Sequence, residues 1–444
     1  MARRLDASDP AFDADFDALL ATKREASSEV GEQVARIVAD VRAGGDEALC
    51  RLTARFDRWN ARPDALAVAP DEVAEAVSRC PDEQLAALRL AADRIEAYHA
   101  RQVPQDARWT DAAGVTLGWR WTPLDAVGLY VPGGTASYPS SVLMNAVPAR
   151  VAGARRLVMV VPTPDGVLNP LVLAAADLAG VTEIYRVGGA QAVAALAYGT
   201  QAIVPVDKIV GPGNAWVASA KRAVFGQVGI DSIAGPSEIM VVADADNDAG
   251  WIAADLLSQA EHDASSQSVL LTDDPGFADA VAAEVERQLS GHPREGIARA
   301  AWTDNSAIVV AAMDAAPGII DRMAPEHLEL AVSDPEAMLA RLRHAGAVFL
   351  GRHAPEAVGD YVAGPDHVLP TARAARFGSG LSVLDFLKRT TITGLTEAAL
   401  REVGPAVVTL AETEGLESHA ESVRRRLGAP PARGGPSEGE TRRP

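Results

Sequence analysis

Three stretches of the chain share one pattern and decide the fold: "VGLYVPGGTASYPSS" (127–141), "EIYRVGGAQAVAALAYG" (183–199) and "DKIVGPGNAWVASAKRAV" (207–224). Each begins with a short run rich in β-branched or aromatic residues, turns on glycines and continues into a segment rich in alanine. A further β-rich run, "RRLVMVVP" (155–162), lies between the first two. Strand, glycine turn and helix in repetition predict a parallel sheet with right-handed crossovers.

Polar residues stand in the glycine turns of this predicted sheet. Ligands of parallel sheets bind beyond the carboxyl ends of the strands, so side chains in the turns should face any ligand. No turn matches G-x-G-x-x-G, so the standard dinucleotide fingerprint is absent. A purely structural role and the binding of a nucleotide or similar ligand are both open for Tyr130, Gly133, Gly134, Gly189, Gln191, Gly213 and Asn214.

A second run of strand and helix patterns begins with "EIMVVAD" (238–244). The sequence therefore predicts an α/β fold with two Rossmann-like lobes that lack the fingerprint, and a small C-terminal arm. The arm is too small for its own core, so we expect it to pack on another body such as a second subunit. The expected segments are an N-terminal extension (1–26), the helical part of the first lobe (27–125), the ligand-facing α/β lobe (126–238), the second α/β lobe with metal and catalytic candidates (239–381), the arm (382–427) and a disordered tail (428–444).

The composition disfavours several classes of function. Among 444 residues, 41 are Lys or Arg and 60 are Asp or Glu, and a net charge of −19 would repel a nucleic-acid backbone. No run of about 18 uncharged apolar residues occurs and the first residues do not resemble a signal peptide, so we expect neither membrane insertion nor export. Two cysteines are too few for a disulfide scaffold, which favours the reducing cytoplasm.

The segment "RMAPEHLEL" (322–330) places Glu326 and His327 side by side after Pro325. Neighbouring side chains diverge by about 100° on a helix and point to opposite faces on a strand, so these two cannot easily form one hydrogen-bonded dyad. They could instead serve two separate protons in catalysis. Alternatively, Pro325 could open a helix whose macrodipole favours Glu326.

Side chains that could bind a metal occur in three places. Gln259 and His262 are three residues apart on a predicted helix, which fits either a polar surface or two ligands of one metal. Zinc would also accept nitrogen and oxygen ligands from "GDYVAGPDHVLP" (359–370) and "AETEGLESHAES" (411–422). The candidates there are Asp360, Asp366, His367, Glu412, Glu414 and His419.

The eight histidines fall into two groups. Four are candidates for chemistry, and each of them has an acidic residue within five positions: His262, His327, His367 and His419. The others lie in amphipathic helices or beside Gly or Arg, and we expect them to be solvated or to cap helices: His99, His292, His344 and His353. Ser237 lacks the G-x-S-x-G elbow of a nucleophile, so we interpret it as a hydrogen-bonding contact or a turn residue.

A series of motifs occurs between about residues 27 and 427: "YVPGG", "VGGAQAVAALAYGT", "KIVGPGN", "GPSEIMV", "DLLSQAEHD", "APEHLEL", "VGDYVAGPDHVLPT", "GSGLSV" and "AETEGLESHAESV". In content and order they resemble the histidinol dehydrogenase family. The resemblance implies a zinc- and NAD-dependent, four-electron oxidation of L-histidinol to L-histidine through bound L-histidinaldehyde, the last steps of histidine biosynthesis. Because His419 lies in the arm, we predict a homodimer whose arms exchange and complete each other's sites.

The resemblance also implies roles for individual residues. His327 would take the hydroxyl proton as hydride leaves for NAD, and Glu326 would activate water to attack the aldehyde. One zinc per subunit would be bound by Gln259, His262, Asp360 and His419. NAD would be held by Tyr130, Gln191 and Asn214. The substrate would be held by Ser237, His367 and Glu414, together with His327 and the zinc ligands.

Other functions fit parts of the same pattern. A related zinc- and NAD-dependent dehydrogenase of another small alcohol, such as a sulfonated diol, would share the machinery, although Glu414 and His367 suit an amine and an imidazole. Aldehyde dehydrogenases are similar in their two-lobed architecture, but they need a catalytic cysteine, and Cys50 and Cys80 lie away from every glycine turn. The remaining alternatives are a zinc hydrolase and a non-catalytic nucleotide-binding protein.

Overall fold

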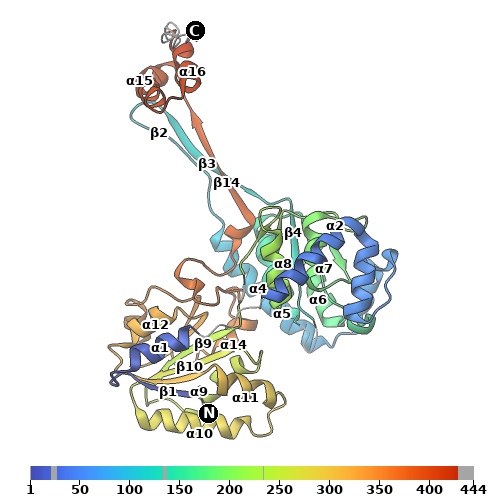
Figure 1. Cartoon of the computed structure of the whole chain (residues 1–444), viewed down its shortest axis with the longest axis vertical. Coiled ribbons are helices and arrows are strands. Elements are labelled where there is room, and N and C mark those ends of the chain that lie inside the picture. The colour runs from blue at the N-terminus through green and yellow to red at the C-terminus, as the bar shows by residue number, and fades with distance from the viewer. Residues whose placement is uncertain (1, 22–27, 134–137, 234, 429–444) are drawn as a thin grey trace, which may run out of the picture. The chain divides into compact units, whose positions relative to one another are not determined.

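The chain divides into two compact units, which the computed structural model describes over residues 2–21, 28–133, 138–233 and 235–428 (Figure 1). The first unit comprises Met1–Val103 and Pro123–Phe386, and the second comprises Pro104–Thr122 and Leu387–Pro444. The tail that was predicted to be disordered lies, apart from Gly428, outside the described residues.

The first unit contains a five-stranded sheet in the order β6-β5-β4-β7-β8. Every neighbouring pair is parallel, which confirms the predicted sheet type. The strands are β4 (Ala126–Tyr130), β5 (Arg156–Val160), β6 (Glu183–Tyr185), β7 (Lys208–Val210) and β8 (Gly229–Ile230). The helices that follow the first four strands are α5 (Pro139–Ala152), α6 (Pro170–Ala179), α7 (Gly189–Tyr198) and α8 (Ala215–Val224).

Further helices cover this sheet on its two sides. Helix α2 (Ser28–Asp57), which bends at Gly45, packs against α7 and α8, while α4 (Asp82–His99) packs against α5 and α6. Helix α3 (Pro70–Ser78) also contacts α6. The small side chains of α7 are buried almost without exception, because the helix is enclosed between the strands and α2.

The first unit also contains a six-stranded sheet in the order β1-β11-β10-β9-β12-β13, again parallel throughout. Two such sheets confirm the predicted pair of Rossmann-like lobes. The strands are β1 (Arg3–Asp6), β9 (Glu238–Ala243), β10 (Gln267–Thr272), β11 (Ala307–Val310), β12 (His327–Ala331) and β13 (Ala347–Leu350). The helices are α1 (Phe12–Leu20), α9 (Ala249–Ala260), α10 (Pro275–Leu289), α11 (Glu295–Asp304), α12 (Ala316–Met323), α13 (Pro335–Leu339) and α14 (Glu356–Tyr361).

Alternate residues of the central strand β9 belong to the cores on the two faces of this sheet. Ile239 and Val241 pack with α9, α10 and α11, whereas Met240 and Val242 pack with α1 and α12. Strand β1 and helix α1 come from the segment that we assigned to an N-terminal extension, so this extension supplies an edge strand and part of a core.

The structure corrects two interpretations of single histidines. His327 begins strand β12, so the alternative in which Pro325 opens a helix is wrong. His99 was expected to be solvated or to cap a helix, but it is fully buried at the end of α4, where its Nδ1 donates to the carbonyl of Ile95 at 2.8 Å.

The second unit combines a sheet and a helical hairpin. Its three-stranded sheet has the order β14-β3-β2 and is formed by β2 (Ala107–Thr110), β3 (Thr116–Pro123) and β14 (Leu387–Gly394). Helices α15 (Glu397–Thr413) and α16 (Glu417–Leu427) pack against each other. The arm thus includes strands from residues that we had assigned to the helical part of the first lobe. Among the described residues, no helix is long and apolar enough to cross a membrane.

Candidate active site at the amino edge of the second sheet

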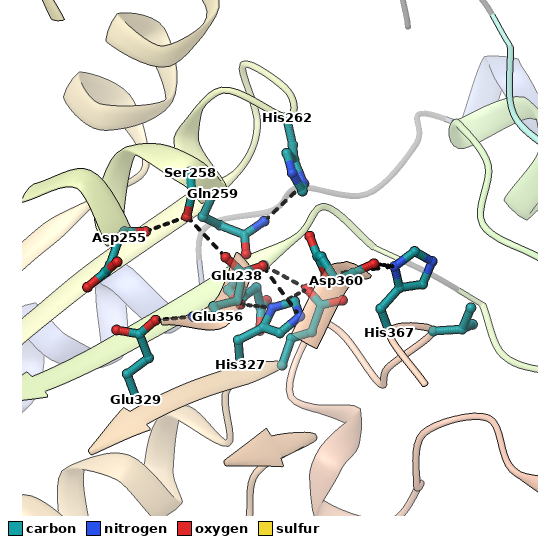
Figure 2. A network of polar contacts seen from close by, with 12 residues as sticks. Glu238, Asp255, Ser258, Gln259, His262, His327, Glu329, Glu356, Asp360 and His367 are labelled. Carbon is teal, nitrogen blue, oxygen red and sulfur yellow. Dashed lines mark hydrogen bonds and ion pairs between the residues drawn. The ribbon is translucent and has the colours of Figure 1, made fainter. Parts of the chain in front are cut away.

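The catalytic candidates of the first unit gather where strands β9 and β12 begin, which we call the amino edge (Figure 2). His327 is the first residue of β12, and Ser237 directly precedes β9. Helix α9 runs back from the opposite edge, so Gln259 lies in its last turn and His262 follows its end. The amide of Gln267, the first residue of β10, donates to the carbonyl of Ser237 at 3.0 Å and thereby joins the starts of strands β9 and β10.

A tight turn delivers Glu326 and His327 to this edge. Ala324 ends α12 in a left-handed conformation with φ 47° and ψ 60°, and Pro325 then prevents the helix from continuing. The carbonyl of Glu326 accepts the amide of Ala347 at 2.9 Å, and a Cβ on Gly346 would lie 2.5 Å from the same oxygen. The turn therefore needs a glycine directly before the neighbouring strand β13.

The backbone of Glu238 orients both candidate bases. Its N–H donates to Oε2 of Glu326 at 2.8 Å, and its carbonyl lies 3.0 Å from Nδ1 of His327. The Glu326 Oε2 and His327 Nδ1 atoms are 3.7 Å apart, beyond hydrogen-bond distance. The two side chains are therefore held separately and do not form a dyad.

The protonation state of His327 follows from its partner. A carbonyl oxygen only accepts, so Nδ1 must carry the hydrogen and Nε2 must present its lone pair. Nε2 is buried and has no hydrogen-bond partner among the described residues. Burial lowers the pKa of His327 to about 4, so the imidazole is neutral at physiological pH. His327 is thus equipped to accept a proton at Nε2.

Glu326 is the second candidate base, and it is also buried. Burial raises the pKa of Glu326 well above its usual range, the hydrogen bond from Glu238 lowers it, and the charges of Glu238, Asp360 and Glu356 raise it further. A carboxylate with a raised pKa is a stronger base than an exposed one, which is what the activation of water requires.

Three side chains converge on a position that could hold a cation. His327, Glu356 and Asp360 each offer a ligand atom, and these atoms lie within 4.8 Å of one another. Glu356 and Asp360 share one face of α14 because they are four residues apart. Burial, followed by the charge of Asp360, raises the pKa of Glu356 to about 8. A bound cation would offset the repulsion within this group.

Gln259 and His262 lie at the same edge, and their side chains point toward the region between Asp360 and His367 (Figure 2). The amide nitrogen of Gln259 is 3.4 Å from Nδ1 of His262. Its Oε1 atom is fully buried and has no hydrogen-bond partner in the described part of the chain. A buried carbonyl-type oxygen without a donor suits a metal ligand, so the residues fit a zinc or similar ion.

His367 also belongs to this group, whereas its neighbour Asp366 does not. Nδ1 of His367 donates to the carbonyl of Asp360 at 3.1 Å, and its Nε2 lies 3.4 Å from Oγ of Ser141 in α5. Burial lowers the pKa of His367 and favours a neutral ring. Asp366 is buried and lies 4.0 Å from His99, outside the group formed by His327, Glu356 and Asp360, so its role as a metal ligand stays a prediction.

The three residues expected to hold NAD lie at the carboxyl edge of the first sheet. Tyr130 ends β4, and its buried hydroxyl accepts the amide of Gly189 at 3.0 Å. Gln191 is buried in the first turn of α7, whereas Asn214 is exposed and caps α8 by accepting the amides of Trp216 and Val217. Of the turn glycines, Gly134 lies outside the described residues.

The turn after β7 is held by a buried ion pair that the sequence analysis missed. Lys221 and Asp231 are ion-paired and almost fully buried. Lys221 donates to the carbonyl of Gly211 at 2.8 Å, while Asp231 accepts its amide at 2.8 Å. A Cβ at Gly211, where φ is 119°, would lie 2.1 Å from the carbonyl oxygen of Tyr130. Strands β4 and β7 therefore approach closely at this edge.

Glu414 and His419 belong to the second unit. Glu414 caps the end of α15, His419 lies in the first turn of α16, and both are exposed. Glu412, also considered for metal binding, forms an ion pair with Arg424 within this unit.

Several acidic residues at the amino edge were not singled out from the sequence. They are Glu238, Asp255, Glu329 and Glu356 (Figure 2). The hydroxyl of Ser258, which was not singled out either, donates to Asp255 and Glu356. For two of the acidic residues, the sequence separation from a residue that had been chosen could have indicated their position. Glu329 is two residues beyond His327 in a strand, and Glu356 is four residues before Asp360 in a helix, so each shares a face with a residue that had been chosen.

Known proteins match the chain over nearly its whole length. The family model for histidinol dehydrogenase matches residues 20–427. The histidinol dehydrogenases of Ruegeria pomeroyi and Cereibacter sphaeroides are 61% and 62% identical, each over 96% of this chain and 99% of the relative. A crystal structure of histidinol dehydrogenase from Elizabethkingia anophelis superposes with a TM-score of 0.91 at 35% identity, covering 96% of this chain and 98% of that one.

The fold and these matches together show that the chain is an α/β oxidoreductase of the dehydrogenase class. Within that class, the chain belongs to the histidinol dehydrogenase family, whose function lies in histidine biosynthesis. The resemblance inferred from the motifs is therefore confirmed.

Proposed function

We propose that this enzyme oxidises L-histidinol to L-histidine in two NAD-dependent steps, with L-histidinaldehyde held between them and zinc in the site. The observation that carries the proposal is the neutral His327 beside the separately held carboxyl of Glu326. Among the described residues, Nε2 of His327 makes no hydrogen bond, and it lies 3.7 Å from Oε1 of Glu356. Two oxidations of one carbon need two bases, and these residues supply them.

In the first step, His327 Nε2 takes the hydroxyl proton while a hydride leaves the carbinol carbon for NAD. The imidazolium that forms keeps its Nδ1 hydrogen bond to the carbonyl of Glu238, which becomes charge-assisted. The buried surroundings keep His327 neutral before the reaction, so it starts in the required form.

In the second step, Glu326 removes a proton from the water that adds to the aldehyde. Because Glu326 keeps that proton, the addition leaves a tetrahedral anion with one hydroxyl group and one oxyanion. This anion transfers its hydride to a second NAD as the oxyanion reforms a carbonyl bond, which gives the carboxylic acid of L-histidine. The N–H of Glu238 aims the Glu326 carboxylate independently of His327. Separate anchors on one peptide segment allow two bases to act at one carbon in turn.

The proposed zinc ligands are Gln259, His262 and Asp360 from the first unit and His419 from the second. When bound, the ion supplies a positive charge that binds nitrogen atoms of the substrate and orients the carbinol carbon. His327 is assigned as a base and not as a ligand, because its one available lone pair cannot serve both purposes. Ser237, His367 and Glu414 are proposed to hold the rest of the substrate.

NAD is proposed to bind at the carboxyl edge of the first sheet. The strand order reverses between β4 and β7, and such a switch point is where dinucleotides bind in doubly wound sheets. Asn214 is exposed there for direct contact, whereas the buried Tyr130 and Gln191 shape the turn that begins α7.

We further propose a cytoplasmic homodimer whose C-terminal arms exchange, so that Glu414 and His419 complete the other subunit's site. Co-expression of His327→Asn and His419→Asn proteins, each deficient in L-histidinol oxidation by itself, should restore activity in the mixed dimer, because one of its two sites has neither substitution. A fully active monomer in sedimentation would contradict this arrangement.

The division of labour between the bases is tested with Glu326→Gln. Single-turnover NADH formation from L-histidinol should keep its first hydride transfer and lose the second, while oxidation of added L-histidinaldehyde should fall by about 10²–10⁴-fold. Equal loss of both steps would refute it. The same assay with and without a chelator tests zinc, and a sulfonated diol in place of histidinol tests the alternative substrate.

A further inference from the structure

Glu329 is a buried carboxyl group that the proposed chemistry does not use. It is the third residue of β12 and is only 3% exposed. Leu328 and Leu330 belong to the core on the α1 and α12 face, so Glu329 points to the opposite face, with His327 and toward α9. A carboxyl group buried in a sheet costs free energy unless hydrogen bonds compensate it.

One hydrogen bond of Glu329 joins it to helix α14. Its Oε1 accepts the amide of Glu356, the first residue of α14, at 2.5 Å. The preceding residue, Pro355, makes no side-chain cap. Amides in a first helical turn lack partners within the helix, so Glu329 acts as a cap that comes from a neighbouring strand.

A second hydrogen bond joins Glu329 to Asp255 in helix α9. Two carboxyl groups can share a hydrogen bond only if one of them carries a proton. One of the two carboxyl groups therefore donates in this contact, while Oε1 of Glu329 also accepts the amide of Glu356.

The two helices are tied at one more point. Oγ of Ser258 in α9 donates to Oε2 of Glu356 in α14 at 3.0 Å. Gln259 directly follows Ser258, and Asp360 lies one helical turn after Glu356. The contacts that Glu329 and Ser258 make with Glu356 therefore lie beside Gln259 in α9 and one helical turn before Asp360 in α14.

We propose that Glu329 is a positioning residue that holds α14 against α9 and sets the spacing of Asp360 and Gln259. The inference rests on the proposed function only where these two residues are taken as zinc ligands. The positioning of α14 itself is independent of the metal.

Two substitutions distinguish the effect of losing these hydrogen bonds from the effect of changing the volume of the buried side chain. Glu329→Gln keeps both hydrogen bonds, because its amide nitrogen donates to Asp255 and its oxygen accepts from Glu356. Glu329→Leu keeps the volume and loses both. Ser306→Ala is the control, since Ser306 is a buried hydroxyl of the same lobe that bonds Ala301 and Ser268 and does not contact α14.

The first measurement is amide hydrogen exchange of residues 351–362 in the metal-free, full-length protein. Glu329→Leu should speed exchange in this segment at least about tenfold, whereas Glu329→Gln and Ser306→Ala should keep wild-type rates. The second is zinc affinity by competition with a chromogenic chelator, where Glu329→Leu should lose about 10–100-fold and Glu329→Gln less than about tenfold.

Unchanged exchange in Glu329→Leu, or equal impairment by Gln and Leu, would overturn the positioning role. A wild-type protein that binds no zinc would contradict the proposed function, while the exchange rates would still decide the role of Glu329. Zinc affinity lost equally in Ser306→Ala would show that any destabilisation of the lobe suffices, and would also overturn the inference.

Discussion

The two parallel sheets of the first unit are built alike but carry their candidate site residues at opposite edges. Both reverse their strand order once, between β4 and β7 in the first and between β9 and β12 in the second. In the first sheet the candidates for cofactor binding lie beyond the carboxyl ends, as doubly wound folds predict. In the second sheet the candidates for metal binding and catalysis lie at the amino ends of the strands, around His327.

Side chains close the corresponding carboxyl edge of the second sheet. Nδ2 of Asn247 donates to the carbonyl of Ala331 at the end of β12 and to that of Asp244 after β9. Arg352, which follows β13, pairs with Asp244 at 2.6 Å. The crevice at this switch point is therefore filled by protein groups that bridge the two strands.

The direction of the helices explains why each edge suits its proposed ligand. Helices that follow parallel strands begin at the carboxyl edge, so α7 and α8 present amide groups and a partial positive charge there. This favours the phosphates of a dinucleotide. Helices α9 and α12 end at the amino edge of the second sheet and present carbonyl groups, which favour a cation.

The largest effect is expected from His327→Asn at the amino edge. Loss of the base should lower kcat for L-histidinol oxidation by about 10²–10⁴-fold, with the KM for NAD and the zinc content unchanged. Kinetics and metal analysis of the purified protein measure these quantities. Loss of zinc in this variant would show instead that His327 is a ligand together with Glu356 and Asp360, the group whose donor atoms lie within 4.8 Å of one another.

Lys221→Met should produce the converse pattern at the carboxyl edge of the first sheet. Removing one partner of a buried ion pair costs about 3–5 kcal/mol of stability and releases the Gly211 turn, so the KM for NAD should rise at least about tenfold. Zinc affinity should not change. Lys208→Met is the matched control, because Lys208 also lies in this sheet but bonds Asp385. A raised KM for NAD in both variants would argue against a specific role for the turn.

The sequence predicted the sheets because their signal is local. Strand, glycine turn and helix recur within stretches of fewer than about twenty residues, and parallel pairing follows from the crossovers. Glu326, His327 and the strand-end residues were likewise chosen from adjacent positions. The motifs implied Gln259 and Asp360, although about a hundred residues separate them in the sequence.

Contacts between distant segments were not predictable in this way. Glu329 contacts Asp255 and Glu356, and nothing in their separate surroundings indicates that α9 and α14 meet. His99 was misjudged because an amphipathic helix with a polar residue near its end predicts exposure, whereas α4 is covered at that point by the loop that carries Asp366. Whether a polar residue is buried depends on which other segment of the chain packs against it.

The acidic character of the amino edge should appear in the pH dependence of stability. The pKa of Glu356 is about 8 in the folded protein and about 4.5 in an unfolded chain, so the unfolded state releases its proton first. Stability should fall as pH rises through this window, by roughly 2 kcal/mol between pH 6.5 and 8. His327 does not contribute there, because its titration lies between about 4 and 6.5.

Chemical denaturation in the presence of a chelator measures this dependence. Glu356→Gln should flatten the slope without abolishing it, since burial also raises the pKa values of Glu326 and Glu329. An unchanged slope in Glu356→Gln would mean that this carboxyl is ionised in the metal-free protein.

The smallest effect is expected from Asn247→Ala at the closed edge of the second sheet. The substitution removes the hydrogen bonds that join β9 to β12, at a cost of about 1–3 kcal/mol, and thermal unfolding should report it. The KM for NAD, kcat and zinc affinity should match the wild type, because the groups that act lie at the other end of these strands. A kinetic change in Asn247→Ala beyond about threefold, without any change in zinc affinity, would mean that a ligand reaches the carboxyl edge of both sheets, and the contrast between them would no longer hold.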